Sequence, residues 1–268
     1  MTPAERRQAF NADLRRRLRQ NAAELDEGVA RLLSTLLELQ GALRDRLGRQ
    51  DPSEFDAEHI PGMLRELDQA VQSWTRKAAG AMKDVVEEVW RRGPRLVEGP
   101  LAAAGLHLGR VVLPASLLTE LQDYTASKIT GLKPAVVERI EGHVRLMVVG
   151  GQTPQQAMVA TGSELGKGPL KTVSFRSETI VRTEGGRIHS MAGQRRLESA
   201  AQLVPGLEKR WLRGKGRPNH AIAGQRRQPD QKFTLVNGIE LMYPRELGAP
   251  VEEVANCACQ SVPYRADW

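Results

Sequence analysis

The chain contains only two cysteines among its 268 residues, and aromatic residues make up 4% of it. Two thiols cannot form the disulfide framework of a small secreted domain, so a reducing compartment is the simplest expectation. No apolar run approaches the ~18 residues that a membrane-spanning helix needs. The charged start MTPAERRQAF lacks the apolar stretch of a secretory signal. We therefore expect a protein without a membrane partner, acting where it is made or in an assembly formed there.

The chain has enough apolar residues, 40%, to build a sizeable core. Its formal net charge of +7 favours an anionic partner, either a nucleic acid or an acidic protein surface.

The first ninety residues carry two apolar stripes with helical spacing, and no proline occurs between residues 4 and 51. The first stripe is Leu18, Ala22, Leu25, Val29, Leu32, Leu36, Leu39 and Leu43. The second follows Pro61 and is Leu64, Leu67, Val71, Trp74, Ala78, Met82, Val85, Val89 and Trp90. Together they predict an antiparallel helical hairpin that ends at Gly93-Pro94. The region 95–114, rich in glycine, proline and alanine, predicts a hinge or an irregular connection.

A helical middle block follows. Periodicity predicts helices over 116–129 and 134–149, and Thr153 with Pro154 has the pattern of a helix start. The glycine-bearing stretch 162–168 lacks the ending of a phosphate-binding loop and is interpreted as a connection. A further helix is expected over 172–201.

The character of the chain changes after Pro205. FTLVNGIELMYP, residues 233–244, predicts a β-hairpin with a two-residue type I′ turn at Asn237-Gly238. The stretch 209–228 has seven basic residues and no acid, and predicts a basic loop held by a few anchors. The predicted fold is thus mainly α with a small β element (α+β): a helical hairpin over 1–110, then a domain over 111–268 formed by the middle block and a C-terminal α+β part.

A pattern spread over some eighty residues resembles the phage Mu F-like head morphogenesis family, the minor head proteins of tailed bacteriophages. It comprises VRTEGGR at 181–187, GRPNH at 216–220, the hairpin and NCAC at 256–259. The core motif covers 181–264, and its structural positions are Arg182, Glu184, Trp211, Gly224, Phe233, Pro244 and Asn256. The chain departs from the family's pattern in RGKG at 213–216, where an acid and a further arginine are usual. It also departs at Ala258, where arginine is usual, and at Gly185-Gly186.

The resemblance implies a minor head (capsid) protein that acts in head morphogenesis near the portal, with DNA packaging or delivery as a further role. The implied partners are the portal protein and capsid or scaffold proteins, and the implied location is the phage head, after assembly in the host cytoplasm. Double-stranded DNA and self-association through the N-terminal helices are further candidates. The alternative function is sequence-nonspecific DNA binding. No HExxH or similar metal-hydrolase pair occurs, so we expect no enzymatic activity.

His220, Cys257 and Cys259 are candidate zinc ligands if the hairpin folds the chain back on itself. A fourth ligand would be water, Asp230, His189 or a residue of another chain. The alternative is that the two cysteines are small buried apolar residues and His220 a hydrogen-bonded core residue.

Five basic residues are candidates for contact with DNA phosphates or an acidic partner, the alternative being a solvated surface: Arg213, Lys215, Arg217, Arg226 and Arg227. Arg182 and Glu184 are candidates for a functional pair, but residues two apart on a helix face different sides. A structural tie of each to the C-terminal loops is favoured, because buried arginine and glutamate normally need partners. Trp211 is expected to anchor the basic loop, with cation–π support.

Overall fold

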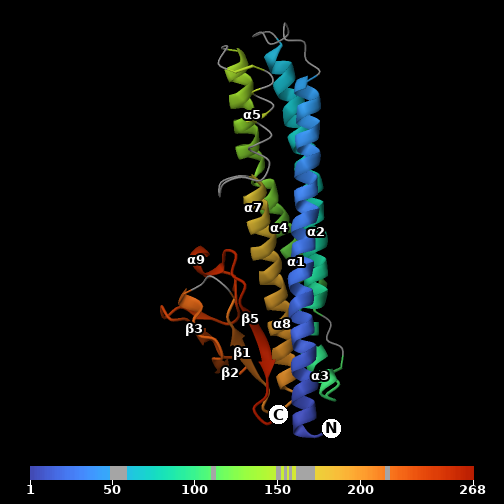
Figure 1. Cartoon of the computed structure of the whole chain (residues 1–268), viewed down its shortest axis with the longest axis vertical. Helices are drawn as coiled ribbons and strands as arrows, with labels where there is room; N and C mark the ends of the chain where they lie inside the picture. Colours follow the sequence, from blue (N-terminus) through green and yellow to red (C-terminus); the bar gives the residue numbers. More distant parts are fainter. Residues whose placement is uncertain are drawn as a thin grey trace. The chain divides into compact units, whose positions relative to one another are not determined.

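The computed structural model describes residues 1–48, 59–109, 113–148, 152–153, 156, 159–160, 173–214 and 218–268. It confirms the predicted fold class, because the chain is mainly helical and ends in small antiparallel sheets (Figure 1). The helices are α1 Pro3–Gly48, α2 Ile60–Arg92, α3 Arg95–Ala103, α4 Ala115–Thr130, α5 Lys133–Val148, α7 Val173–Ile180, the π-helical turn η2 Val181–Gly185, α8 Gly186–Ala201, the 3₁₀ turn η3 Pro218–His220 and α9 Val251–Val254. The strands are β1 Glu208–Leu212, β2 Arg226–Arg227, β3 Phe233–Thr234, β4 Glu240–Leu241 and β5 Gln260–Tyr264.

The chain forms two compact units, which we call the sheet-bearing unit and the helical unit. The sheet-bearing unit consists of Met1–Glu27, Val85–Gln122 and Val181–Trp268, and the helical unit of Gly28–Asp84 and Asp123–Ile180. The helices α1, α2 and α4 contribute residues to both. The division into domains 1–110 and 111–268 stays a prediction.

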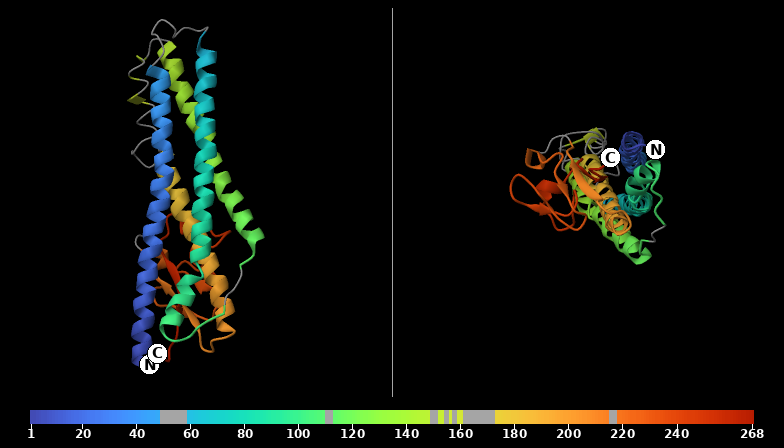
Figure 2. Two further views of the ribbon diagram at one scale, coloured as in Figure 1. Left: turned by 90° about the vertical axis from the view of Figure 1, so that its right-hand side faces the viewer. Right: turned by 90° about the horizontal axis from the view of Figure 1, so that it is seen from below.

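The two apolar stripes are buried along most of their length. In the helical unit, the Trp74 indole Nε1 donates to Thr35 Oγ1 at 3.1 Å, which ties α2 to α1. In the sheet-bearing unit Arg92, at the end of α2, pairs with Glu24 near the start of α1 at 2.7 Å. These pairs require an antiparallel hairpin, and Figure 2 shows α1 and α2 side by side.

The middle block follows the sequence prediction where it is described. The helices α4 and α5 coincide with the two predicted segments to within one residue at each end. Thr153 caps a helix start reciprocally with Gln156: the Gln156 N–H donates to Thr153 Oγ1 at 3.2 Å, and the Thr153 N–H to Gln156 Oε1 at 2.8 Å. Residues 162–168, interpreted as a connection, lie outside the described residues.

The prediction of an irregular connection over 95–114 was wrong for its first half, where α3 forms. Leu96, Val97 and Leu101 are buried at helical spacing, and they pack against residues of α1 and α8. Glycine and proline usually interrupt helices, so their presence here concealed the apolar face. In the structure Pro100 is accommodated within the helix.

The larger sheet has the strand order β2-β1-β5, and β1 pairs antiparallel with both neighbours. The prediction of a basic loop over 209–228 was therefore wrong for residues 209–212, which belong to the central strand. Lys209 and Trp211 point inward and are buried, while Arg210 between them is half-buried. A half-buried strand is recognised by alternating apolar and polar residues, and the lysine at an inward position interrupts this alternation.

The predicted hairpin forms, with Phe233 opposite Leu241 and Thr234 opposite Glu240. Its turn is not the predicted type I′, because only Gly238 has a positive φ, of 83°. The Gly238 N–H donates to the Leu235 carbonyl and the Leu235 N–H to the Ile239 carbonyl, so the loop is the three-residue 236–238. The Asn237 side chain donates through Nδ2 to Glu253 Oε1 at 2.7 Å, which holds this alternative loop.

The helix predicted over 172–201 is confirmed as α7, η2 and α8, with a π-helical turn in its middle. In the sheet-bearing unit α8 packs against α3 and β5 (Figure 1). The core there combines residues from both ends of the chain: Phe10, Leu14, Leu96, Val97, Leu101, Ala104, Leu197, Ala200, Val204, Leu207 and Val262. The Phe10 and Trp268 rings lie 5.3 Å apart, so the two termini are neighbours (Figure 2).

Candidate metal centre

His220, Cys257 and Cys259 come together as one buried cluster. The imidazole Nδ1 lies 3.4 Å from each of the two sulfur atoms. The three potential ligand atoms all lie within 4.8 Å of one another, so the cluster could hold a metal ion. Asp230 and His189, the protein residues considered as a fourth ligand, do not belong to it; it has three members among the described residues.

Short local structures place these three side chains. His220 ends the 3₁₀ turn η3, and both cysteines follow the single turn of α9. Asn256 has a φ of 53°, a left-handed conformation that asparagine tolerates better than most residues and that ends helices. The chain therefore reverses immediately after α9, with Cys257 and Cys259 facing His220. The Gly214 N–H donates to Cys259 Sγ at 3.1 Å and fixes the second thiol.

A carboxylate completes the surroundings of His220. The imidazole Nε2 lies 2.9 Å from Glu253 Oε2, and Glu253 Oε1 accepts hydrogen bonds from Asn219 Nδ2 and Asn237 Nδ2 at 3.0 and 2.7 Å. A carboxylate on the distal nitrogen is the usual partner of a metal-ligating histidine, because it sets the tautomer and ring orientation. Sequence analysis missed Glu253, although it lies only four residues before Cys257.

The electrostatics of the cluster favour a thiolate next to the imidazole. A hydrogen bond from the Cys259 thiol, together with His220 and the Arg245 charge, lowers the pKa of Cys257 to about 4, whereas the same hydrogen bond and burial raise the pKa of Cys259. Burial alone would lower the pKa of His220, but Cys257 and Glu253 outweigh it and raise this pKa. Burial opposes ionisation of Glu253, yet hydrogen bonds from Asn219, His220 and Asn237 lower its pKa.

Arg245 is the second residue that sequence analysis missed. It is 2% exposed and has a φ of 65°, which is strained for a residue with a Cβ. Its Nη1 donates to the Cys257 carbonyl and its Nη2 to Ser190 Oγ at 3.1 Å. A Cβ on Gly186 would lie 2.6 Å from the Arg245 Cζ, so only glycine leaves space for this guanidinium. Arg245 thus links α8 to the cysteine loop.

The VRTEGGR segment contacts the loop that carries the two cysteines through the Thr183 hydroxyl. The Asn256 N–H donates to Thr183 Oγ1 at 3.0 Å. Glu184 pairs with Arg187, whose Nε donates to the Arg245 carbonyl at 2.9 Å. Glu184 is therefore tied to the C-terminal loops through Arg187, whereas Arg182 pairs with Asp26 of α1 at 2.8 Å.

The remaining motif positions support the same core. Trp211 is fully buried and makes edge-to-face contacts with His220 and Phe233, whose ring centres lie 5.6 and 5.1 Å away. These aromatic contacts hold it, where cation–π support was expected. Gly224 has a φ of 85°, and its N–H donates to the Trp211 carbonyl at 2.9 Å. Pro244 is buried and directly precedes the strained Arg245.

The backbones of Gly214 and Ala258 lie against each other. A Cβ on Gly214 would lie 2.4 Å from the carbonyl carbon of Ala258, so the chain between the two cysteines packs on the Gly214 backbone.

The structure describes three of the five predicted basic residues. Arg213 is exposed. The Arg227 guanidinium donates to the carbonyls of Lys232 and Arg226 at 3.2 and 2.9 Å. Arg226 lies against the Tyr264 ring. Lys215 and Arg217 lie outside the described residues.

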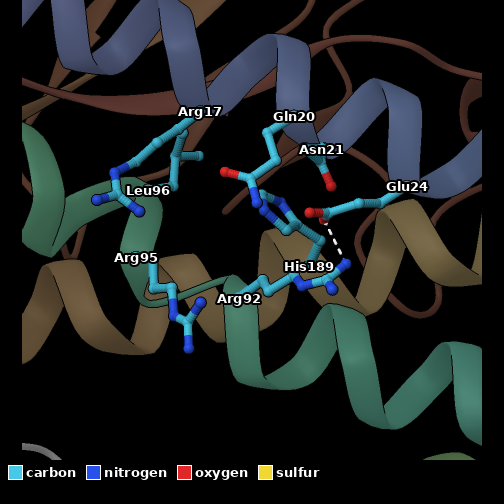
Figure 3. A pocket seen from close by; sticks show the side chains of 8 residues that line it. All are labelled: Arg17, Gln20, Asn21, Glu24, Arg92, Arg95, Leu96 and His189. Atoms are coloured by element: carbon cyan, nitrogen blue, oxygen red, sulfur yellow. Dashed lines mark ion pairs between the residues drawn. The ribbon is translucent and has the colours of Figure 1, made fainter.

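His189 lines a separate polar cavity with residues of α1, α2 and α3 (Figure 3). The His189 ring lies close to the Gln20 side chain, and Glu24 pairs with Arg92 beside it. Burial, and secondarily the Arg245 charge, lowers the pKa of His189 to about 3. His189 is therefore neutral at pH 7.

No helix in the described part of the chain combines the length and the apolar character needed to cross a membrane. Comparison of the chain with protein-family models, with curated proteins and with solved structures found no match.

Proposed function

We propose that this chain is a minor head protein of a tailed bacteriophage, acting in head morphogenesis near the portal. The observation that supports it is the convergence of the motif. Thr183 accepts a hydrogen bond from Asn256, and Gly186 lies against the Arg245 guanidinium. Trp211, Phe233 and both cysteines share one apolar core. Segments some eighty residues apart thus form one packed unit, as expected if the pattern marks a folding unit.

The same geometry favours a structural role for the motif over catalysis. His220 and both thiols are buried, and the second imidazole nitrogen is occupied by Glu253. A general base or a nucleophile must come within hydrogen-bond reach of a substrate, which this packing opposes.

We further propose that the cluster holds Zn²⁺ as a tie between the His220 turn and the cysteine loop. One imidazole nitrogen and two thiolates are favourable zinc ligands, and Glu253 supplies the usual second partner of the histidine. Water or a residue of a neighbouring chain would complete the four ligands.

The zinc proposal is tested by measuring the metal content of the purified full chain by mass spectrometry. We expect about one zinc per chain and a lower melting temperature after chelation. Cys257→Ser and His220→Asn should each lose the metal, because each removes one of the three candidate ligands. Metal-free protein with an unchanged melting temperature in chelator would mean that the cysteines serve packing alone.

The head-protein proposal is tested on particles of the parent phage. DNA-filled virions and empty proheads are separated on a gradient, and the chain is quantified against the portal protein by mass spectrometry. We expect a low, fixed ratio in both. Absence from both kinds of particle would remove the proposal.

A further inference from the structure

A second polar cavity of the sheet-bearing unit lies between the first turns of α1 and the strands β1 and β5. About 370 Å³ of space lies within it, part of which is open solvent. Three arginines line it: Arg7, Arg210 and Arg265. No acidic side chain is among its lining residues in the part of the chain that the structure describes.

The protein neutralises this positive charge only in part. Arg265 pairs with the exposed Asp267, with Nε 2.9 Å from Oδ1. Across the described ranges, no ion pair joins Arg7 or Arg210 to a carboxylate, and the buried Nε of Arg210 has no hydrogen-bond partner. Because each guanidinium offers five N–H donors, donors remain for a ligand.

The β1–β2 ladder brings a fourth arginine to the same place. Arg210 lies directly opposite Arg226, and their guanidinium carbons lie 5.0 and 5.2 Å from the centre of the Tyr264 ring. Like charges opposite one another destabilise an antiparallel pair. Glu208, 3.8 Å from Arg226, offsets this repulsion in part. An anion bound between the guanidinium groups would offset the remaining repulsion.

Aromatic rings orient the arginines before any ligand arrives. Arg210 stacks on Tyr264, and Arg265 lies 5.0 Å from the centre of the Trp268 ring, which itself packs edge-on against Phe10. Guanidinium groups that are held in this way lose less side-chain freedom when they bind, and their planar fork matches the oxygens of a phosphate.

We propose that this cavity binds phosphate, with Arg7, Arg210 and Arg265 contacting the oxyanion. A DNA backbone and a small phosphorylated ligand offer the same tetrahedral group, and the experiment distinguishes them. Of the predicted basic residues that the structure describes, Arg226 lies beside this site, against the Tyr264 ring. The proposal depends neither on the metal centre nor on the head-protein assignment, because purified protein suffices to test it.

The first arm of the test uses inorganic phosphate. The melting temperature of the full chain is measured in sodium phosphate and in sodium chloride at equal ionic strength and pH. We expect a higher melting temperature in phosphate, because a ligand that binds only the folded state stabilises it. Arg7→Gln and Arg265→Gln should at least halve this difference. Arg15→Gln, an exposed arginine farther along α1 outside the cavity, is the matched control and should preserve it.

The second arm measures the anisotropy of a fluorescent 20-base-pair duplex over a range of salt concentrations. If DNA is the source of the phosphate, Arg7→Gln should reduce the slope of log K against log salt by about 1, and inorganic phosphate should compete. A phosphate effect without DNA binding would assign the site to a small phosphorylated ligand. Equal melting temperatures in the two salts, or a phosphate effect that Arg7→Gln leaves unchanged, would overturn the proposal.

Discussion

Arg245 combines a buried positive charge with a left-handed backbone, and each of these is unfavourable on its own. Its guanidinium spans from Ser190 of α8 to the carbonyl of Cys257, and its own carbonyl accepts from Arg187. Glycine at this position would relieve the backbone strain but would remove all the side-chain contacts. The strain is therefore maintained by what the side chain connects, namely the π-turn helix and the cysteine loop.

Gly214→Ala tests the contact on which the cysteine loop rests. The new Cβ would lie 2.4 Å from the Ala258 carbonyl carbon, which is backbone and cannot rotate away. We expect a loss of about 1–3 kcal/mol in the free energy of unfolding, typical of overpacking, and a lower metal content. Urea unfolding and metal analysis measure the two effects.

Gly80→Ala in α2 is the control for that substitution. Among the described residues, nothing lies within 4 Å of a Cβ at Gly80, so we expect no loss and a gain of up to about 1 kcal/mol from helix propensity. Equal stability of the two variants would contradict the close contact at Gly214.

His189 makes stability depend on pH. Its folded-state pKa, lowered by burial to about 3, is below the unfolded value of 6.5, so the unfolded chain binds the extra proton between these values. Stability is therefore lost as the pH falls from 6.5 toward 3, at up to about 1.4 kcal/mol per pH unit. Between pH 6.5 and 5, we expect the free energy of unfolding of His189→Gln to fall by up to about 2 kcal/mol less than that of the unmodified chain. Urea unfolding at the two pH values measures this difference. Parallel pH profiles would show that His189 is not buried in the neutral form.

At the scale of elements, the π-helical turn η2 occupies the first five residues of VRTEGGR. Such turns interrupt α-helices mostly at sites with a specific role. Here the turn contributes Thr183, whose hydroxyl accepts the Asn256 N–H just beyond α9. The π-helical turn thus forms a contact surface for the loop that follows α9.

Thr183→Val tests this docking. The variant keeps the shape of the side chain but removes the hydroxyl that accepts the part-buried hydrogen bond from the Asn256 N–H, and such a bond contributes about 0.5–1.5 kcal/mol to stability. Thr183→Ser retains the hydroxyl and is the matched control, with a smaller loss. Urea unfolding measures both, and we expect the valine variant to be the less stable. Equal losses would mean that the hydroxyl contributes nothing beyond packing.

The elements that the sequence predicted correctly have strong periodicity and consistent composition. The helices α1, α2, α4 and α5 carry unmistakable apolar stripes. The element α3 was missed because glycine and proline mask its apolar face. The strand β1 was missed because its inward residues are a lysine and a tryptophan, and β5 contains Pro263, which is compatible with a strand only at an edge.

The sequence predicted the three candidate ligands of the site but not the residues that hold them in place. His220, Cys257 and Cys259 carry reactive side chains that mark them in any sequence. Glu253 and Arg245 are ordinary charged residues whose importance depends on what they contact after folding. No local pattern distinguishes a buried, hydrogen-bonded glutamate from a solvated one.

At the scale of the whole molecule, the sheet-bearing unit is assembled from three separate stretches of the chain. Phe10, Leu14 and Val97 from the first hundred residues share one core with Leu197 and Val262. Each stretch alone would expose this apolar surface to water. The core therefore joins the N-terminal helices α1 and α3 to the C-terminal elements α8 and β5.

Separate expression of residues 111–268 tests whether the boundary expected at 110 is a true domain boundary. Without α1 and α3, the fragment lacks half of the core around Leu197 and Val262, so we expect it to bind a hydrophobic dye and to lose the cooperative melting of the full chain. Co-expression with residues 1–110 should restore cooperative melting, because that fragment supplies the missing core side chains even though it is not covalently joined. A fragment that melts cooperatively by itself would establish 111–268 as an independent domain, and the N-terminal contacts would then be an addition to a core that is already sufficient.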